Sequence, residues 1–217
     1  MSPPARFFGK YRGVVTDNAD PKGLGRLKVT VPSLLLDTAT WAMPCSPFAG
    51  PGVGFFVMPP EKARIWVEFE AGRLERPIWS GGFWDVESPP PEPVMLDTPV
   101  DPTVKIFKSS SVNLKIDDKE GGGMSLTIGP PAVEKPITIT GDGSGYKITV
   151  GEATLTLSET VELSLGDVKL TLSSSALLSA GGASLTLSSD GANLTTSSSV
   201  TVTGSSVSVN DGALQVS

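Results

Sequence analysis

Carboxylates are the side chains of this chain whose spacing could support chemistry. Glu61, Glu68, Glu70 and Glu75 lie close enough in sequence to supply the acid and base of a glycosidase. Nothing in the sequence sets the separation that such a pair requires. We therefore interpret the four glutamates as solvated residues on the surface of a folded domain.

A second acidic group, Asp117, Asp118 and Glu120, could bind a cation through its oxygens. It lacks the Asp-X-Asp-X-Asp-Gly frame of a calcium loop, so a turn is favoured. The glycine-rich residues 121–123 and 141–145 lack a following Lys-Ser/Thr and helix, which a phosphate loop needs. We expect them to be turns between strands.

Histidine is absent and Cys45 is the only cysteine. This composition excludes Ser-His-Asp triads, Cys-His dyads and histidine metal sites. No intrachain disulfide can form, which fits assembly in a reducing bacterial cytoplasm. We expect Cys45, beside Pro44, to be a small buried apolar residue. The sequence predicts no catalytic residue, no cofactor and no metal.

Composition divides the chain into two parts. All four tryptophans and seven of the eight phenylalanines lie in the first 84 residues, and no proline follows Pro136. Residues 1–85 carry a net charge of +2 and residues 86–217 one of −8. Neither part has the basic surface that nucleic-acid binding requires. The start of the chain lacks an apolar signal segment, and no apolar run reaches membrane-helix length.

Residues 7–85 show the pattern of a small β-barrel. Strands are expected at residues 11–16, 24–31, 55–58, 64–70 and 77–81. Within the fourth of these, Ile65, Val67 and Phe69 alternate with polar or amphipathic residues and are expected to face the core. Five short strands in this length indicate an OB-type barrel. The organisation we predict is a head at 1–85, a proline-rich linker at 86–103, a β-meander neck at 104–152 and a β-helix spike at 153–217.

The last part of the chain repeats a short apolar-polar-apolar pattern about every seven residues. Turn residues such as Gly166-Asp167, Gly181-Gly182 and Asp190-Gly191 separate the segments. A single chain of this kind cannot cover its own apolar stripe. The repeat therefore predicts an intertwined homotrimer, whose three chains alternate within each sheet. We expect the trimer core to contain Leu163, Leu170, Leu187, Val202 and Val209.

Several segments of the head resemble the OB domain of contractile-tail spikes. This family includes the V-type phage baseplate assembly proteins, the phage tail-lysozyme spike and the valine-glycine repeat spikes of type VI secretion. Residues 110–118 are similar to the segment that opens the family's β-prism, with Ser111-Val112 in place of Gly-His. The head segments that carry the resemblance are Gly13-Val-Val, Gly25-Arg-Leu-Lys-Val-Thr-Val-Pro, Trp41-Ala-Met-Pro, Gly50-Pro-Gly-Val-Gly, Val67-Glu-Phe-Glu-Ala-Gly and Arg76-Pro-Ile-Trp-Ser-Gly-Gly-Phe-Trp.

The resemblance implies a minimal spike from a phage tail or a phage-like injection system. We expect no lysozyme insert and no fused hub domain, both of which occur in other members of the family, and without histidine there is no His-X-His pair to hold an iron. The family implies a trimeric tube hub against Phe7, Phe8, Tyr11, Arg12 and Trp41, and other baseplate components as partners. It also implies a small tip protein of the Pro-Ala-Ala-Arg repeat type at Leu214, Gln215, Val216 and Ser217. The target-cell membrane would be met on firing.

Two other function classes are compatible with parts of the sequence. One is a trimeric receptor-binding or glycan-degrading tailspike, which needs aromatics and paired carboxylates along the stem. The other is an OB module for single-stranded nucleic acid or a sugar, with Trp66 beside Glu68 and Glu70 as its groove. The acidic net charge disfavours nucleic acid, and packing of Trp66 at a trimer or hub interface is the plainer interpretation.

Overall fold

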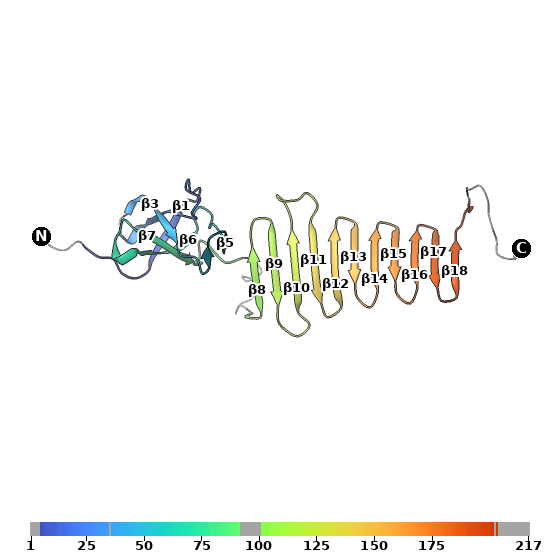
Figure 1. Ribbon diagram of the computed structural model, residues 1–217. Coiled ribbons are helices and arrows are strands. Elements are labelled where there is room, and N and C mark those ends of the chain that lie inside the picture. The colour runs from blue at the N-terminus through green and yellow to red at the C-terminus, as the bar shows by residue number, and fades with distance from the viewer. Residues whose placement is uncertain (1–4, 35, 92–100, 202, 204–217) are drawn as a thin grey trace, which may run out of the picture. The chain divides into compact units, whose positions relative to one another are not determined.

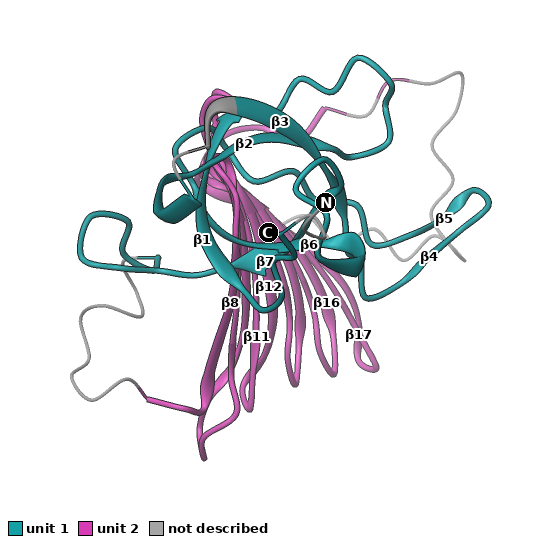
Figure 2. Cartoon of the chain, turned by 90° about the vertical axis from the view of Figure 1, so that its left-hand side faces the viewer, with its two compact units in different colours: residues 1–96 teal, residues 97–217 magenta. Residues whose placement is uncertain are grey.

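The computed structural model describes residues 5–34, 36–91, 101–201 and 203. The chain divides into two compact units, residues 1–96 and residues 97–217, which are coloured separately in Figure 2. Over the described residues the fold is all-β, with two single-turn 3₁₀ helices, η1 (Pro32–Leu34) and η2 (Glu70–Gly72). The expected fold class is confirmed.

The first unit contains a closed five-stranded barrel in the order β1-β2-β3-β7-β6. Strands β2 and β3 pair antiparallel, and β3 pairs in parallel with β7, with Met43 opposite Ile78. A separate two-stranded hairpin, β4–β5, belongs to the same unit. The strands are β1 (Tyr11–Asp17), β2 (Leu27–Val31), β3 (Leu36–Pro44), β4 (Ala49–Gly50), β5 (Val53–Gly54), β6 (Arg64–Phe69) and β7 (Pro77–Gly82).

Alternating residues of the strands fill the barrel. Ile65, Val67 and Phe69 of β6 are buried as predicted, while the residues between them are only partly buried. Period-two alternation on a pleated strand sends these three side chains to one face. The buried core consists of Val15, Leu27, Val29, Val31, Ala42, Ile65, Val67 and Phe69.

Three details of the expected barrel are wrong. Residues 55–58 form no strand, and β3, which was not predicted, takes that place in the barrel. The second strand begins at Leu27 rather than at residue 24, because the loop before it is held by Asp20. Cys45 is exposed rather than buried.

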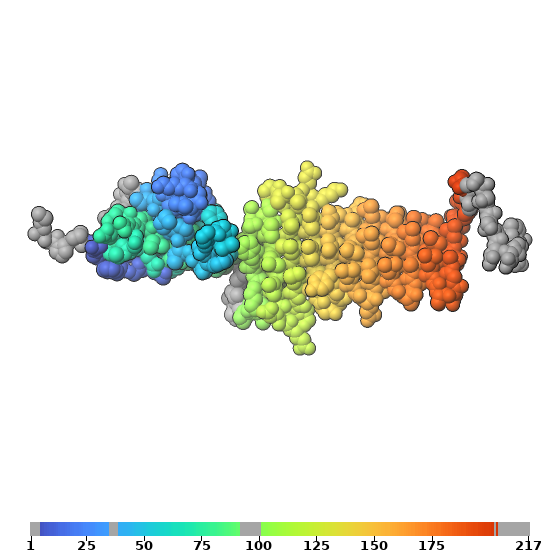
Figure 3. All heavy atoms as spheres, viewed as in Figure 1, coloured from blue at the N-terminus to red at the C-terminus, as the bar shows by residue number. Residues whose placement is uncertain are grey.

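The second unit is one antiparallel sheet of eleven strands in chain order, from β8 to β18 (Figure 1). Each strand pairs with the next one along the chain. The space-filling view shows them as successive bands of colour from green to red (Figure 3). The strands are β8 (Val104–Lys108), β9 (Val112–Asp117), β10 (Gly123–Ile128), β11 (Ile137–Asp142), β12 (Gly145–Val150), β13 (Ala153–Leu157), β14 (Val161–Leu165), β15 (Val168–Leu172), β16 (Ala176–Ala180), β17 (Ala183–Ser188) and β18 (Gly191–Thr195).

Tight loops at alternate ends of the strands keep this sheet in register. Gly151, Gly166 and Gly181, each fifteen residues after the last, open two-residue loops with φ of 60°, 54° and 54°. Two-residue hairpins of the II′ type need this positive φ at their first position, which glycine adopts at little cost. The repeating unit is thus a hairpin of fifteen residues, not a single strand of seven.

The pairing corrects one expectation about the stem. We expected three chains to alternate within each sheet, but the described strands pair with their neighbours in the same chain. Leu163 lies opposite Leu155 on one side and Leu170 on the other, all in one chain. The physical reason is the short loops, which return the chain to the adjacent position before it could cross to another sheet.

Candidate assembly interface

One face of the eleven-stranded sheet carries an unbroken column of large apolar side chains. Residues directly opposite each other on paired strands project to the same face. Following the pairs from strand to strand gives one residue from each strand. This central column is Phe107, Leu114, Leu126, Ile139, Ile148, Leu155, Leu163, Leu170, Leu178, Leu185 and Leu194.

Two further columns flank the central one on the same face. Over β13 to β17 every position in them is apolar. One flanking column runs Leu157, Val161, Leu172, Ala176 and Leu187, and the other runs Ala153, Leu165, Val168, Ala180 and Ala183. The apolar face is therefore three side chains wide in this part of the stem.

The opposite face of these strands is polar apart from Leu177, which lies between Thr171 and Thr186. Hydroxyl side chains dominate it, as in the paired row Thr149, Thr154, Ser164. Glu162 and Lys169 form an ion pair on this face, with Nζ and Oε2 2.7 Å apart. The sheet thus separates an apolar surface from one that water can solvate.

The apolar face is uncovered in a single chain. Sixteen of its large side chains are between 36% and 60% exposed, including Leu163 at 52%, Leu165 at 60% and Leu187 at 49%. A contiguous apolar surface of this size on a folded protein marks an interaction surface. Its chemistry suits burial against another apolar surface. The side chains with any hydrogen-bonding atom among these sixteen are Met124 and Tyr146, which lie in the flanking column of Leu157.

The structure places three of the five expected trimer-core residues on this face. Leu163 and Leu170 lie in the central column and Leu187 in a flanking one. Val202 and Val209 lie outside the described residues. So do the expected tip contacts Leu214, Gln215, Val216 and Ser217. The expected core set did not include Leu178 or Leu194, which the pairing assigns to the central column; Leu194 fits the apolar repeat of the sequence, whereas Leu178 does not follow its pattern.

The expected hub-contact residues divide among different environments in the barrel. The rings of Phe7 and Tyr11 pack edge-on against Phe69, with centroids 6.3 and 5.5 Å away. Phe8 is 72% exposed. These side chains therefore include two that help to close the barrel core and one that is free to contact another molecule.

Arg12 and Trp41 both take part in cation–π contacts within the head. The guanidinium of Arg12 lies 5.8 Å from the Trp66 ring and 5.2 Å from Phe83. Arg26 lies 5.2 Å from Trp41. Trp66 thus has partners within its own chain, and the contact of these residues with a hub stays a prediction.

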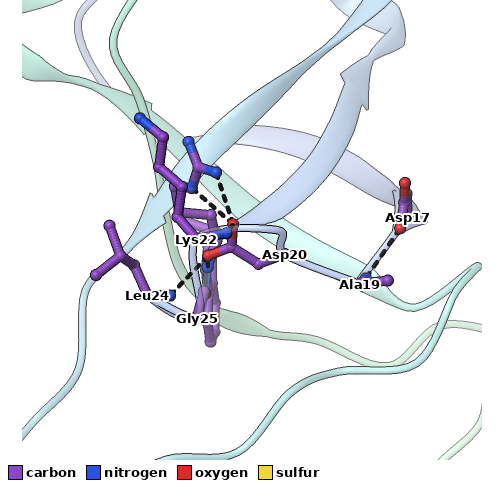
Figure 4. Close-up of polar contacts among 8 residues, drawn as sticks. Asp17, Ala19, Asp20, Lys22, Leu24 and Gly25 are labelled. Carbon is purple, nitrogen blue, oxygen red and sulfur yellow. Dashed lines mark hydrogen bonds and ion pairs between the residues drawn. The ribbon is translucent and has the colours of Figure 1, made fainter.

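The loop that carries Arg26 is organised by one carboxylate. Asp20 accepts hydrogen bonds from the backbone N–H of Lys22, Leu24 and Arg26, at 3.0, 2.8 and 3.1 Å (Figure 4). Its Oδ1 also accepts from Arg26 Nε and Nη2, at 3.0 and 2.6 Å. The Arg26 hydrogen bonds, with those from the backbone, hold the pKa of Asp20 well below its usual value. The guanidinium of Arg26 therefore binds Asp20 within this loop and is not available to bind an acidic partner.

The four glutamates considered for glycosidase chemistry are either in ion pairs or exposed. Glu68 pairs with Lys10 at 2.9 Å and Glu70 with Arg76 at 3.5 Å, while Glu61 and Glu75 are exposed.

In the second acidic group, Asp117 pairs with Lys119 at 3.0 Å, and Asp118 pairs with Lys105. The hydrogen bond from Lys119 is the main cause that lowers the pKa of Asp117. Within the described residues no group of three or more His, Cys, Asp or Glu side chains is placed to hold a metal ion.

A protein-family comparison assigns the class of the head. Residues 11–84 match the family model of the type VI secretion system/phage-baseplate injector OB domain. Over these residues the head is therefore similar to the injector OB domain family, and the resemblance to contractile-tail spikes is confirmed for that segment. No curated protein sequence matches the chain. None of the helices in the described part is long and apolar enough to cross a membrane.

Proposed function

We propose that three copies of this chain form the central spike of a contractile injection machine, with a mechanical role and no chemical reaction. One observation carries the proposal: an injector OB domain is followed by an eleven-stranded sheet whose apolar face is open in a single chain. Such a face requires further copies, and a baseplate is the setting in which the OB family works.

The dimensions of the sheet favour three copies. Strands of five residues give a face about 17 Å wide, and packed sheets lie about 10 Å apart. Three such faces closed into a triangular prism would each lie about 5 Å from the common axis, which is half that packing distance. The central column would then fill the axis and the flanking columns the corners, so that each side chain meets its equivalents at one level.

The prism would also suit penetration of a membrane. Eleven strands at about 4.8 Å spacing span about 48 Å, which exceeds the ~30 Å hydrocarbon core of a bilayer. Backbone hydrogen bonds between successive strands would run along the axis, and hydroxyl-rich faces would line the outside. Sheath contraction would supply the energy of penetration.

Other components complete the proposed machine. A trimeric tube hub would contact the head at Phe8 and its neighbours, and other baseplate proteins would surround it. A tip protein would cap the three C-terminal ends, because open strand edges invite pairing. The chain would assemble in the bacterial cytoplasm and end in a phage tail or an injection particle. Truncation before Asn210 should abolish capture of a co-expressed tip protein while hub binding persists.

The test of the proposal is the mass of the purified chain. Analytical ultracentrifugation or native mass spectrometry should give three chain masses, stable in mild detergent. A folded, stable monomer would end the spike proposal. Two chain masses would instead indicate a face-to-face pair of sheets and would refute the prism geometry.

A further inference from the structure

The head presents a second apolar surface, separate from its barrel core. Residues 41–60 contain no Asp, Glu, Lys or Arg over twenty positions. Most of their large apolar side chains point outward instead of filling the barrel. The exposed ones that line a common groove are Phe48 (60%), Val53 (59%), Phe55 (56%), Phe56 (68%) and Val57 (44%), and Leu24 (52%) lines the same groove. We call these six side chains the hairpin patch.

The hairpin that carries the patch is firmly built. Phe55 N–H donates to Phe48 O at 2.9 Å, and Ser46 Oγ bridges the carbonyl oxygens of Phe48 and Phe55 at 2.9 and 3.0 Å. The Pro51-Gly52 turn has φ of +73° at the glycine, as a type II turn requires. The exposed aromatic rings therefore lie on an ordered hairpin, whose conformation these hydrogen bonds stabilise.

An open groove of about 1100 Å³ lies between this hairpin and the barrel. Phe56 lies over Gly25, so close that a Cβ there would come within 3.0 Å of the ring. Trp79 forms another part of the lining and donates from Nε1 to Gly25 O at 3.1 Å. The groove and the exposed rings form one continuous apolar surface with no charge from residues 41–60.

We propose that the hairpin patch packs against the heads of the other two copies of this chain. An uncharged apolar surface is complementary to itself, and the interfaces of permanent assemblies have this composition. The inference rests on the proposed trimer, because the joined stems would hold three heads at high effective concentration. Each head would then bury its patch without any electrostatic steering.

Cross-linking of the full chain tests this contact. In a Cys45→Ser background, Val53→Cys places a thiol in the patch, and Val86→Cys places one at a 99% exposed position of the same unit outside the groove. A short bismaleimide should link Val53→Cys chains to one another several-fold more than Val86→Cys chains. Equal linkage, or none at position 53, in a preparation of trimer mass would overturn the inference and leave the proposed spike intact.

A charge at the same two positions gives an independent readout. Val53→Asp should leave the trimer mass unchanged, because the stem maintains association, but should lower the unfolding midpoint of the head and raise binding of an apolar dye. Val86→Asp should change neither. If both variants behave alike as trimers, the patch does not lie between heads. If the unmodified chain is monomeric, it is the proposed function that fails.

Discussion

Leu163 and Ser164 are adjacent on β14 and project to opposite faces of the stem, which makes them a matched pair for testing the proposed prism. Leu163 is in the central column, opposite Leu155 and Leu170. Ser164 is on the polar face, opposite Lys169. Either substitution places an aspartate on the same strand, so the main difference between the two variants is the face on which the new charge lies.

The expected magnitudes follow from exposure. Leu163 is 52% exposed in one chain, and full burial of a leucine contributes about 1.5–3 kcal/mol. Association would therefore gain about 1 kcal/mol per chain at this position, or about 3 kcal/mol per trimer. Leu163→Asp removes that gain and brings three carboxylates together at one level of the axis, where each loses several kcal/mol of hydration.

We expect Leu163→Asp to give aggregate or monomer and Ser164→Asp to give trimer with stability within about 1 kcal/mol of the parent. Sedimentation velocity and thermal unfolding at equal protein concentration measure both. Equal tolerance of the two substitutions would refute the assignment of the apolar face to the trimer core. Equal damage would show that β14 tolerates no charge on either face, which contradicts a solvated outer surface.

Three further changes test the two units. Leu27→Ala, at a fully buried position of the barrel, should cost about 2–5 kcal/mol in denaturant unfolding of the head, whereas Lys28→Ala should cost little. Gly145→Ala should lower the melting temperature of the stem, because φ is +130° and a Cβ would lie 2.1 Å from a backbone oxygen; Gly143→Ala, with open space around it, should not. Asp20→Asn should speed amide exchange in its loop. Folding lowers the pKa of Asp20 below the usual 3.8, so the contribution of this carboxylate to stability is complete above that pH and is lost as the pH falls through the lowered pKa. The Asp20→Asn variant should therefore lack this part of the decrease in stability at acid pH.

Local alternation predicted much of the structure, and long-range pairing accounts for most of what it missed. The alternation of β6 correctly assigned Ile65 and Val67 to the core, because period-two patterning is a property of one strand. Strand β3 was not recognised from such a pattern, and its place depends on antiparallel pairing with β2 and parallel pairing with β7. The loop before Leu27 is shaped by a carboxylate several residues upstream, which no pattern of hydrophobicity records.

The stem illustrates the same division. Its apolar residues and turn glycines can be recognised in the sequence, and the period-two alternation of each strand then assigns Leu163 and Leu170 to the apolar face. Whether consecutive strands pair with each other or with other chains depends on loop geometry instead. Here the loops opened by Gly166 and Gly181, with positive φ, return the chain directly to its neighbour. The pairing within one chain could therefore not be read from the apolar repeat alone.

Pairing within one chain changes how the proposed spike would bear load. Every strand from β9 to β17 has both ladder neighbours in its own chain, so the backbone hydrogen bonds of each face are complete before association. What association adds is the burial of three columns of apolar side chains, which acts across the axis. Compression along the axis would then be borne by three separate hydrogen-bonded ladders, and splitting of the needle would be opposed by the side-chain core. Resistance to compression and resistance to splitting thus arise from different interactions. Substitution of the turn glycines should weaken resistance to compression, and charges in the central column should weaken resistance to splitting.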